Sequence, residues 1–302
     1  MAIIGPPNAG KSTLINAAVD EKVSIASPKM QTTRARVLGV AIHKDTQVEY
    51  VDTPGMLSPL ARFGGKKVMR DLLLEAADAT MDADAIVCVL DAAKTWGPNE
   101  THVLRSLESS HALPVHFVLN KIDYLPGDSS GAQREDHKWR SALWDALGDT
   151  DGVDKDRVHP GLEDAPISMV SAKYGEGLDS VFSWVADILP EGSWNYPSWW
   201  KSDASPVDRI QDLIKEQVFI RLNQEIPYIV HPTVTHWTPL PSSAKLRIDV
   251  ELPVKTLVQA RALIGKHGSV ISAIKSYALP GIAEAVGKDE SDVLLYLRVV
   301  RV

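Results

Sequence analysis

Cysteine and long apolar runs are the two features that this sequence most lacks. Cys88 is the only cysteine among 302 residues, so the chain forms no internal disulfide, and a metal site built on cysteines is not expected. No stretch reaches the roughly 18 consecutive apolar residues of a membrane-spanning helix. Hydrophobic residues make up 44% and charged residues 24%, which is typical of a folded globular chain and argues against disorder. We therefore expect a folded protein of a reducing compartment.

Excess basic charge is lacking as well, because the net charge is −7. The balance differs along the chain: residues 205–302 carry 12 Lys+Arg against 10 Asp+Glu, a balance of +2, and residues 1–204 carry 20 against 29, a balance of −9. Such a chain is not expected to bind nucleic acid over its whole surface. We expect a polyanion to bind the C-terminal third instead.

The hydrophobic pattern predicts two domains, which a length of 302 residues allows. Up to about residue 190, short apolar runs alternate with helical stretches, and this alternation predicts a three-layer α/β fold with a mostly parallel sheet. Residues 191–206 break both periodicities with prolines and aromatic residues, and we interpret them as a linker between a domain at 1–190 and one at 207–302. The strands expected in the first domain cover residues 37–42, 48–51, 85–90, 115–119 and 167–170.

The C-terminal domain has a different order of elements, which predicts a smaller α+β fold. Its aromatic-rich entry, residues 194–200, either stacks on nucleobases or packs the linker against a domain, and we favour packing. The expected elements are a helix at 207–222, strands at 228–237 and 245–254, helices at 254–264 and 269–278 around a glycine turn, and a strand at 293–300.

The first chemical motif is a phosphate-binding loop. Gly5-Pro6-Pro7-Asn8-Ala9-Gly10-Lys11-Ser12 matches the pattern G-x-x-x-x-G-K-[ST]. It lies between a short apolar strand and a helix, which is the position that this pattern requires to bind phosphate. Glycines let backbone amides surround phosphates, and a helix N-terminus adds a positive dipole end. We expect Lys11 to bridge the β- and γ-phosphates, Ser12 to hold magnesium, and Thr13 to follow within the same site.

Three further motifs follow expected strands in the order that a doubly wound fold requires of a ligand site. Asp52-Thr53-Pro54-Gly55 places a carboxylate near the magnesium shell and a glycine amide near the γ-phosphate. Asn120-Lys121-Ile122-Asp123 offers a carboxylate to the two N–H donors of guanine, and Asn120 can tie the loops together. Adenine is rejected, because it would leave that charge unpaired. Ser171-Ala172-Lys173 places backbone near the guanine oxygen.

The segment before the strand expected at residues 37–42 indicates which class of GTP-binding protein this is. Gln31-Thr32-Thr33-Arg34 resembles the Q-T-T-R motif of the Era family of translation-factor-class GTPases. That resemblance implies a P-loop GTPase domain that binds GTP and GDP with magnesium. It also implies that Thr33, with Thr32 as the alternative, ligates magnesium in the GTP state.

Met56 stands where Ras-like enzymes carry the glutamine that orients the attacking water, as is usual in Era-like GTPases. A methionine cannot orient water, so we expect slow intrinsic hydrolysis helped by another group. In related GTPases an asparagine at the position of Asn8 helps to bind potassium, and potassium dependence is therefore a hypothesis. The alternative is that Asn8 only hydrogen-bonds the loop. The residues expected to act in hydrolysis are Asn8, Lys11, Thr33 and Gly55.

A second motif lies in the C-terminal domain. Gly265-Lys266-His267-Gly268 follows Ile264 between two expected helices, and with the order of elements it resembles the G-x-x-G loop of a type II KH domain. Such a loop clamps single-stranded nucleic-acid backbone. We expect Lys266 to face phosphates, whereas His267 either adds a contact or is simply exposed. Ile226-Pro227-Tyr228 also resembles a motif of the Era family.

A KH domain after an Era-type GTPase domain is the arrangement of the Era family, so the resemblance covers nearly the whole chain. It implies a monomer that binds small-subunit ribosomal RNA near its 3′ end and assists assembly of the small ribosomal subunit. Because Met56 leaves no water-orienting side chain, an assembly scaffold with vestigial GTP turnover is the alternative. An RNA-modifying GTPase is disfavoured, because no further nucleophile or cofactor motif is present.

Three sequence features resemble mitochondrial members of the family more than bacterial ones: the residues of the phosphate-binding loop, the acidic insert after Asp123 and the linker. We therefore expect the mitochondrial matrix, with a bacterial-type cytoplasm as the alternative. The glycine motif begins at Gly5, so any targeting peptide would lie outside this sequence. Membrane association does not follow from the sequence.

Overall fold

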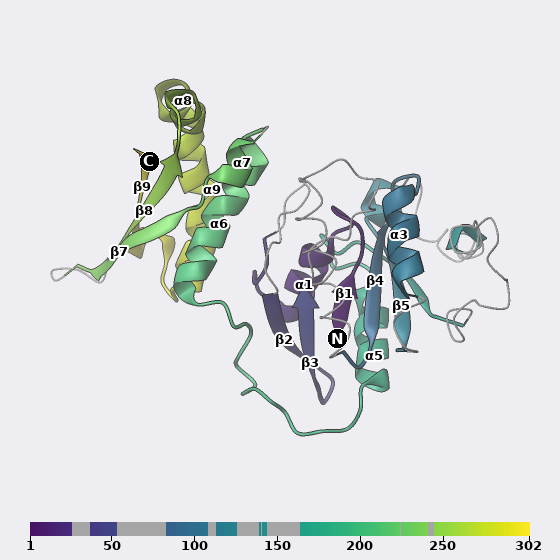
Figure 1. Cartoon of the computed structure of the whole chain (residues 1–302). Helices are drawn as coiled ribbons and strands as arrows, with labels where there is room; N and C mark the ends of the chain where they lie inside the picture. The colour runs from purple at the N-terminus through teal and green to yellow at the C-terminus, as the bar shows by residue number, and fades with distance from the viewer. Residues whose placement is uncertain are drawn as a thin grey trace. The chain divides into compact units, whose positions relative to one another are not determined.

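The computed structural model describes residues 1–25, 37–52, 83–107, 113–125, 139, 141–143, 164–223, 225–240 and 245–302. The described residues of Met1–Ser24 and of 37–202 form one compact unit, and those of Asp203–Val302 belong to another; they are called the first and the second unit below (Figure 1). Within these ranges, no helix is both long and apolar enough to cross a membrane.

The first unit is built on a six-stranded sheet with the strand order β2-β3-β1-β4-β5-β6 (Figure 1). Only β2 runs antiparallel to its neighbour, β3, and the other four neighbouring pairs are parallel. The central strands β1, β4 and β5 are buried along their whole length, which explains their continuous apolar sequences. The bounds are β1 (Ala2–Ile4), β2 (Val37–His43), β3 (Thr46–Asp52), β4 (Ile86–Asp91), β5 (Val115–Asn120) and β6 (Ile167–Val170).

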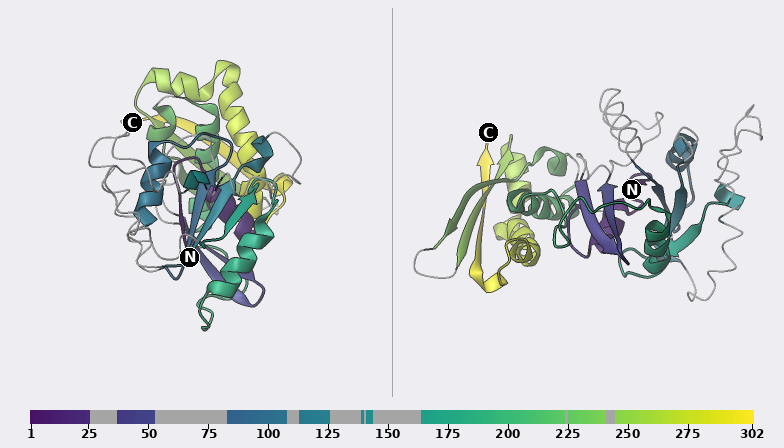
Figure 2. Two further views of the ribbon diagram at one scale, coloured as in Figure 1. Left: turned by 90° about the vertical axis from the view of Figure 1, so that its right-hand side faces the viewer. Right: turned by 90° about the horizontal axis from the view of Figure 1, so that it is seen from below.

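Helices cover both faces of this sheet, which gives the expected three layers (Figure 2). On β4, Val87 and Val89 belong to the core shared with α1 (Lys11–Val19) and α5 (Leu178–Ile188). Cys88 and Leu90 belong to the core shared with α3 (Pro98–Leu107). Successive residues of a strand point to opposite faces, so β4 feeds both cores. Burial also raises the pKa of the Cys88 thiol to about 12, as expected of an inert structural cysteine.

The segment after α5 follows the outer edge of the sheet. Gln47 accepts hydrogen bonds from the backbone N–H groups of Asn195 and Tyr196, at 3.0 Å each, and donates to the Tyr196 carbonyl at 2.8 Å. Tyr196 stacks on Trp200 with ring centroids 4.2 Å apart. The backbone of the linker is therefore held against the first unit, and these two rings stack on each other, whereas Trp194 and Trp199 are 47% and 75% exposed.

Near its end this segment also pairs with the edge strand. Gly39 of β2 forms an antiparallel bridge with Ser202, and the Val40 N–H donates to the Lys201 carbonyl at 2.8 Å. Lys201 in turn donates to the Val19 carbonyl at the end of α1, at 2.9 Å. An unpaired strand edge offers backbone groups for such pairing, so the segment covers the edge of the sheet.

The second unit combines a three-stranded sheet, of order β7-β8-β9, with helices on one face (Figure 1). β7 runs antiparallel to β8, and β9 runs parallel to it. Alternate residues of β8 are buried against the helices. The bounds are α6 (Pro206–Arg221), α7 (Ile226–Ile229), β7 (Thr233–Pro239), β8 (Leu246–Val254), α8 (Leu257–Ile264), α9 (Ser269–Ala285) and β9 (Val293–Arg301).

Three of the expected bounds in this unit were wrong. The strand expected from residue 228 begins only at Thr233, because Ile226-Pro227-Tyr228 opens α7 and the Tyr228 ring packs edge-on against Phe219, 5.2 Å away. The helix expected from residue 254 begins at Leu257, because Thr256 and Gln259 form a capping box. The helix expected to end at residue 278 continues to Ala285 and accommodates Pro280.

His116 on β5 makes the stability of the first unit depend on pH. Its side chain is almost fully buried, with Nε2 2.8 Å from the Ser168 hydroxyl, and burial lowers its pKa to about 4. A histidine that folds only in its neutral form stabilises the folded state above its unfolded pKa of about 6.5, and this contribution is lost as the pH falls toward 4. The expected loss is on the order of 2–3 kcal/mol.

The measurement is urea unfolding of the wild type and of a His116→Gln variant between pH 7 and pH 4.5. The variant cannot take up a proton at this position, so the stability of the wild type should fall more steeply with pH than that of the variant. Parallel curves would show that His116 does not cause the pH dependence.

Candidate nucleotide site and nucleic-acid interface

The predicted nucleotide residues lie at one edge of the first sheet. Because β1, β3, β4, β5 and β6 are parallel, their carboxyl ends meet there, as in open α/β folds that bind ligands at this edge. The phosphate-binding loop follows β1, Asp52 ends β3, the Asn120 motif follows β5, and the Ser171 motif follows β6.

The phosphate-binding loop has the backbone that its glycines predict. Gly10 adopts φ +99°, and a Cβ built there would lie 2.1 Å from Nδ2 of Asn120, so only glycine fits. α1 begins at Lys11 without a side-chain cap, which leaves its first amides and positive dipole end for an anion. The loop and helix together form an anion-binding site.

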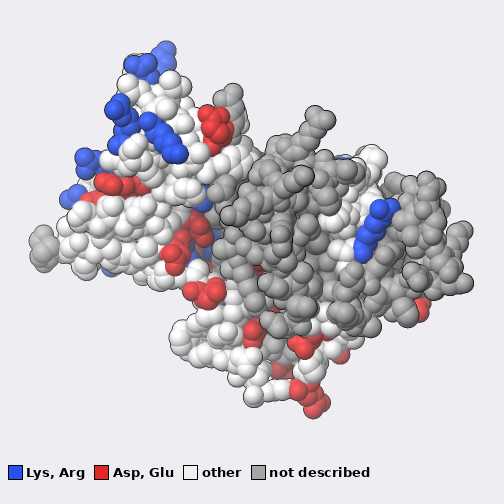
Figure 3. Space-filling model, viewed as in Figure 1, with Lys and Arg blue, Asp and Glu red and all other residues white. Residues whose placement is uncertain are grey.

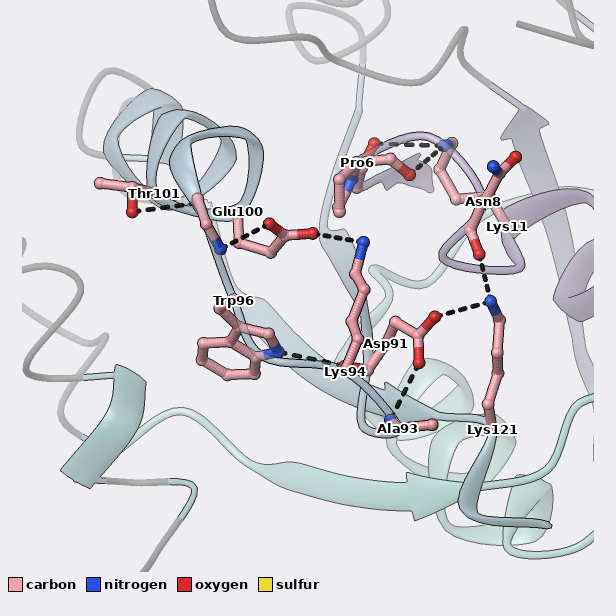
Figure 4. A network of polar contacts seen from close by, with 12 residues as sticks. Pro6, Asn8, Lys11, Asp91, Ala93, Lys94, Trp96, Glu100, Thr101 and Lys121 are labelled. Atoms are coloured by element: carbon pink, nitrogen blue, oxygen red, sulfur yellow. Dashed lines mark hydrogen bonds and ion pairs between the residues drawn. The ribbon is translucent and has the colours of Figure 1, made fainter. Parts of the chain in front are cut away.

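Lys11 lies inside this loop. Its ammonium donates to the carbonyl oxygens of Gly5 and Pro6 at 3.1 Å each, and its side chain is buried (Figure 4). Burial lowers the pKa of Lys11 to about 8, and nearby Asp52 opposes this shift. A desolvated ammonium beside a helix N-terminus interacts strongly with phosphate oxygens.

The two predicted magnesium ligands of the described part of the chain lie together. Ser12 Oγ donates to Asp52 Oδ2 at 2.7 Å, and Ser24 Oγ donates to the same carboxylate oxygen at 2.6 Å. Hydroxyl and carboxylate oxygens are the hard ligands that Mg²⁺ takes, usually one or two from the protein, with water and phosphate completing the shell. The donor set therefore fits Mg²⁺. Sequence analysis missed Ser24, which Asn16 places by accepting the Ser24 N–H at 2.8 Å.

Asn120 joins three of the predicted loops, as its motif predicted. Its Nδ2 donates to the carbonyl of Ala9 at 2.9 Å, and its Oδ1 accepts the Ala172 N–H at 3.0 Å. Ser171 Oγ donates to Asp123 Oδ1 at 2.7 Å. The loop over the phosphates is therefore connected through one amide side chain to the two loops expected at the guanine base.

Sequence analysis also missed a network beside this site (Figure 4). Lys121, in the left-handed conformation, donates to the Asn8 carbonyl and forms an ion pair of 2.7 Å with Asp91 at the end of β4. Buried Glu100 accepts the Gly97 N–H at 2.9 Å and pairs with Lys94 at 2.7 Å. Asp91 could have been suspected, because it ends a buried strand as Asp52 and Asn120 do.

Some predicted residues are not placed by the structure. The motif Gln31-Thr32-Thr33-Arg34, the residues Thr53, Pro54 and Gly55, and Met56 lie outside the described residues. Their roles at magnesium and the γ-phosphate stay predictions. The structure does place Lys173, which ends the Ser171 motif and is exposed.

The G-x-x-G motif of the second unit forms a tight exposed turn between α8 and α9. Gly265, His267 and Gly268 adopt φ +77°, +54° and +78°. A Cβ at Gly265 would lie 2.5 Å from Val270 Cγ2, whereas nothing lies within 4 Å of a Cβ at Gly268. The turn leads into the uncapped N-terminus of α9, so backbone amides face solvent there, as clamping of a phosphate backbone requires.

The surface of α8 next to this turn is apolar and basic. Leu257, Val258 and Ile264 are 58%, 74% and 39% exposed, and Arg261 lies on the same helical face. Figure 3 shows Lys and Arg side chains gathered over the end of the second unit that carries α8. Exposed apolar side chains beside basic ones suit nucleobases and phosphates.

The parallel sheet, the phosphate-binding loop with its buried lysine, and the Asn120–Asp123 and Ser171–Lys173 loops define a P-loop GTPase. A family model described as "50S ribosome-binding GTPase" matches residues 1–121. Over 299 residues the chain is 34% identical to GTPase Era of Rhizobium meliloti, covering 99% of this chain and 86% of that protein. It is 33% identical to GTPase Era of Agrobacterium fabrum, with 99% and 84% covered. The chain belongs to the Era family of GTPases.

Solved structures agree over both units. A crystal structure of Era in complex with MgGDPNP and nucleotides 1506–1542 of 16S ribosomal RNA superposes with a TM-score of 0.80 at 28% identity, covering 100% of this chain and 92% of that one. A variant of Aquifex aeolicus Era bound to GDP and aluminium fluoride gives 0.78 at 27%, with the same coverage. The expected fold is confirmed: a P-loop GTPase domain followed by a KH domain.

Proposed function

We propose that this GTPase is a GTP-controlled RNA-binding switch that binds small-subunit ribosomal RNA near its 3′ end and assists assembly of the small ribosomal subunit. The main support is that the whole chain superposes on Era in complex with MgGDPNP and 16S nucleotides 1506–1542. This chain also has both the phosphate-binding loop, held by Asn120, and the G-x-x-G turn. In this proposal residues 1–190 bind nucleotide, 191–206 link, and 207–302 bind RNA as a monomer.

The residues of the first unit would divide the work of GTP hydrolysis. Lys11 and the first amides of α1 hold the phosphates, and Asp123 reads guanine. The bond from the Ala172 N–H to Asn120 holds the Ser171–Lys173 backbone beside the base. Ser12, Asp52 and Thr33 would hold Mg²⁺, which neutralises charge between the β- and γ-phosphates when bound. Gly55 would donate its amide to the γ-phosphate. Since Met56 cannot orient water, intrinsic turnover should be slow.

Potassium could supply part of the missing positive charge, through Asn8. Asn8 is half-buried in the phosphate-binding loop at φ +63°, and its carbonyl is already held by Lys121. Equal GTP turnover in sodium and in potassium buffers would exclude this role.

In the second unit, Lys266 and the amides that open α9 would hold the RNA backbone, and Ile264 with its neighbours on α8 would contact bases. His267 is exposed beside them. The nucleotide state would control this binding through Thr33 and Gly55, because a γ-phosphate orders such loops and hydrolysis releases them.

The experiment is to crosslink the protein to RNA in cells and to map the bound nucleotides for the wild type, Gly268→Asp and Gly287→Asp. Both glycines have positive φ, so both substitutions carry a similar backbone strain, and neither built Cβ meets another atom within 4 Å. Gly287→Asp therefore controls for that strain, and only Gly268→Asp puts a carboxylate where phosphate is expected. Crosslinks at the 3′ end of small-subunit rRNA should vanish in Gly268→Asp alone. Crosslinks elsewhere, or an unaffected Gly268→Asp variant, would contradict the proposal.

The compartment is a separate part of the proposal. The relatives named above are bacterial. The proposal of a mitochondrial location is based on the resemblance in the residues of the phosphate-binding loop, the insert and the linker. Detection of the chain in purified mitochondria of its source organism, protected from added protease, tests it.

A further inference from the structure

Two tyrosines flank the loops expected at the guanine base, and neither belongs to a nucleotide motif. Tyr124 directly follows Asp123, and Tyr174 directly follows Lys173. Both rings are largely exposed, at 68% and 66%. Large exposed aromatic side chains at the edge of a binding site have apolar area to offer a ligand.

Tyr174 fixes the side chain of Lys173. The Lys173 ammonium donates to the Tyr174 hydroxyl at 2.8 Å and lies 4.6 Å from the centroid of the ring. This hydrogen bond raises the pKa of Lys173, and the Asp123 carboxylate adds to the shift. Lys173 and Tyr174 therefore form one cluster.

The same cluster is anchored to the phosphate-binding loop. Ser171 holds Asp123, and Asn120 holds the Ala172 amide, so the backbone on either side of the cluster is fixed. A restrained lysine presents its methylene stem to a neighbouring flat surface at a lower entropy cost than a free one. A purine bound by Asp123 would be that surface.

We propose that Tyr174 is a positioning residue that holds Lys173 against the bound guanine, and that Tyr124 and Tyr174 form an aromatic rim which slows nucleotide release. The inference rests on the proposed guanine site. Its substrate class is unchanged, because Asp123 reads the base and the rim determines how long the base stays.

The test is the dissociation rate of a fluorescent GDP from the full chain, measured by stopped flow in Tyr174→Ala, Tyr174→Phe and Tyr124→Ala. Tyr174→Ala and Tyr124→Ala should each dissociate roughly three- to tenfold faster than the wild type, the effect of one lost side-chain contact. Tyr174→Phe keeps the ring and loses the hydroxyl, so an intermediate acceleration is expected. In a Lys173→Met background, adding Tyr174→Phe should not change the dissociation rate further, because the Tyr174 hydroxyl has already lost the Lys173 ammonium.

Two readouts separate this role from a merely structural one. Single-turnover hydrolysis of bound GTP should be unchanged in the Tyr174 and Tyr124 variants with Lys173 intact, since the rim does not contact phosphates, and their thermal unfolding without nucleotide should be unchanged as well. Dissociation rates equal to the wild type in Tyr174→Ala would overturn the inference while leaving the guanine site intact. Failure of the wild type itself to bind fluorescent GDP would instead refute the proposed function.

Discussion

Replacing Asp123 by asparagine should convert the protein from a guanine to a xanthine nucleotide enzyme. The asparagine amide cannot accept the second N–H of guanine, but it can donate to the oxygen that xanthine carries there. A hydrogen bond to a charged group is worth up to about 3 kcal/mol, so kcat/KM for GTP should fall by as much as roughly 100-fold while that for XTP rises. Ser171 can still donate to the Oδ1 of asparagine, so the loop should keep its position.

The measurement is hydrolysis of GTP and XTP by Asp123→Asn and by Asp20→Asn. Asp20 is the exposed C-cap of α1 in the left-handed conformation, which asparagine also adopts, so this control should behave as the wild type. A variant that still prefers GTP would show that the base does not bind at Asp123.

Exchanging Lys11 for methionine should have the largest effect on the chemical step. The methionine side chain fills a similar buried space, so the unit should fold, but the charge beside the phosphates is lost. Removing one group that stabilises transition-state charge lowers turnover by roughly 10²–10³-fold. Single-turnover hydrolysis of Lys11→Met, with exposed Lys255→Met as the control, measures it. Turnover within about fivefold of the wild type would contradict the role of Lys11 and support a different phosphate contact.

The predictable parts of this molecule were those whose chemistry is local in the sequence. The phosphate-binding loop needs Gly10 and Lys11 next to each other before a helix, and the structure confirms the turn and the start of the helix. The buried strands were predictable because a parallel sheet covered on both faces needs continuous apolar runs, such as Ile86–Asp91.

The parts that sequence analysis missed depend on residues far apart in the chain. Lys121 pairs with Asp91, 30 positions earlier, and Gln47 holds Asn195 and Tyr196, about 150 positions later. No spacing rule connects such residues, because only the assembled sheet brings them together. α7 was missed for another reason, since the apolar residues around Pro227 fit a strand pattern as well as a short helix.

The linker segment gives the proposed switch a physical route within the first unit. In the sequence, the hairpin of β2 and β3 begins shortly after Thr33 and ends at Asp52. Gly39 and Gln47 of the same hairpin contact residues 195–202. A shift of this hairpin with nucleotide state would therefore reach the residues that lead into α6. Coupling between two sites requires an element that both can bias, and this hairpin is a candidate.

The central claim is that nucleotide state controls RNA binding. The most direct measurement is the affinity of the full chain for an RNA corresponding to nucleotides 1506–1542 of 16S ribosomal RNA, by fluorescence anisotropy, with Mg²⁺ and either a non-hydrolysable GTP analogue or GDP. Typical coupling energies of 1–3 kcal/mol predict binding at least about fivefold tighter with the GTP analogue, and Gly268→Asp should abolish binding in both states. Equal affinity of the wild type in both states would contradict the switch, even if the RNA binds tightly.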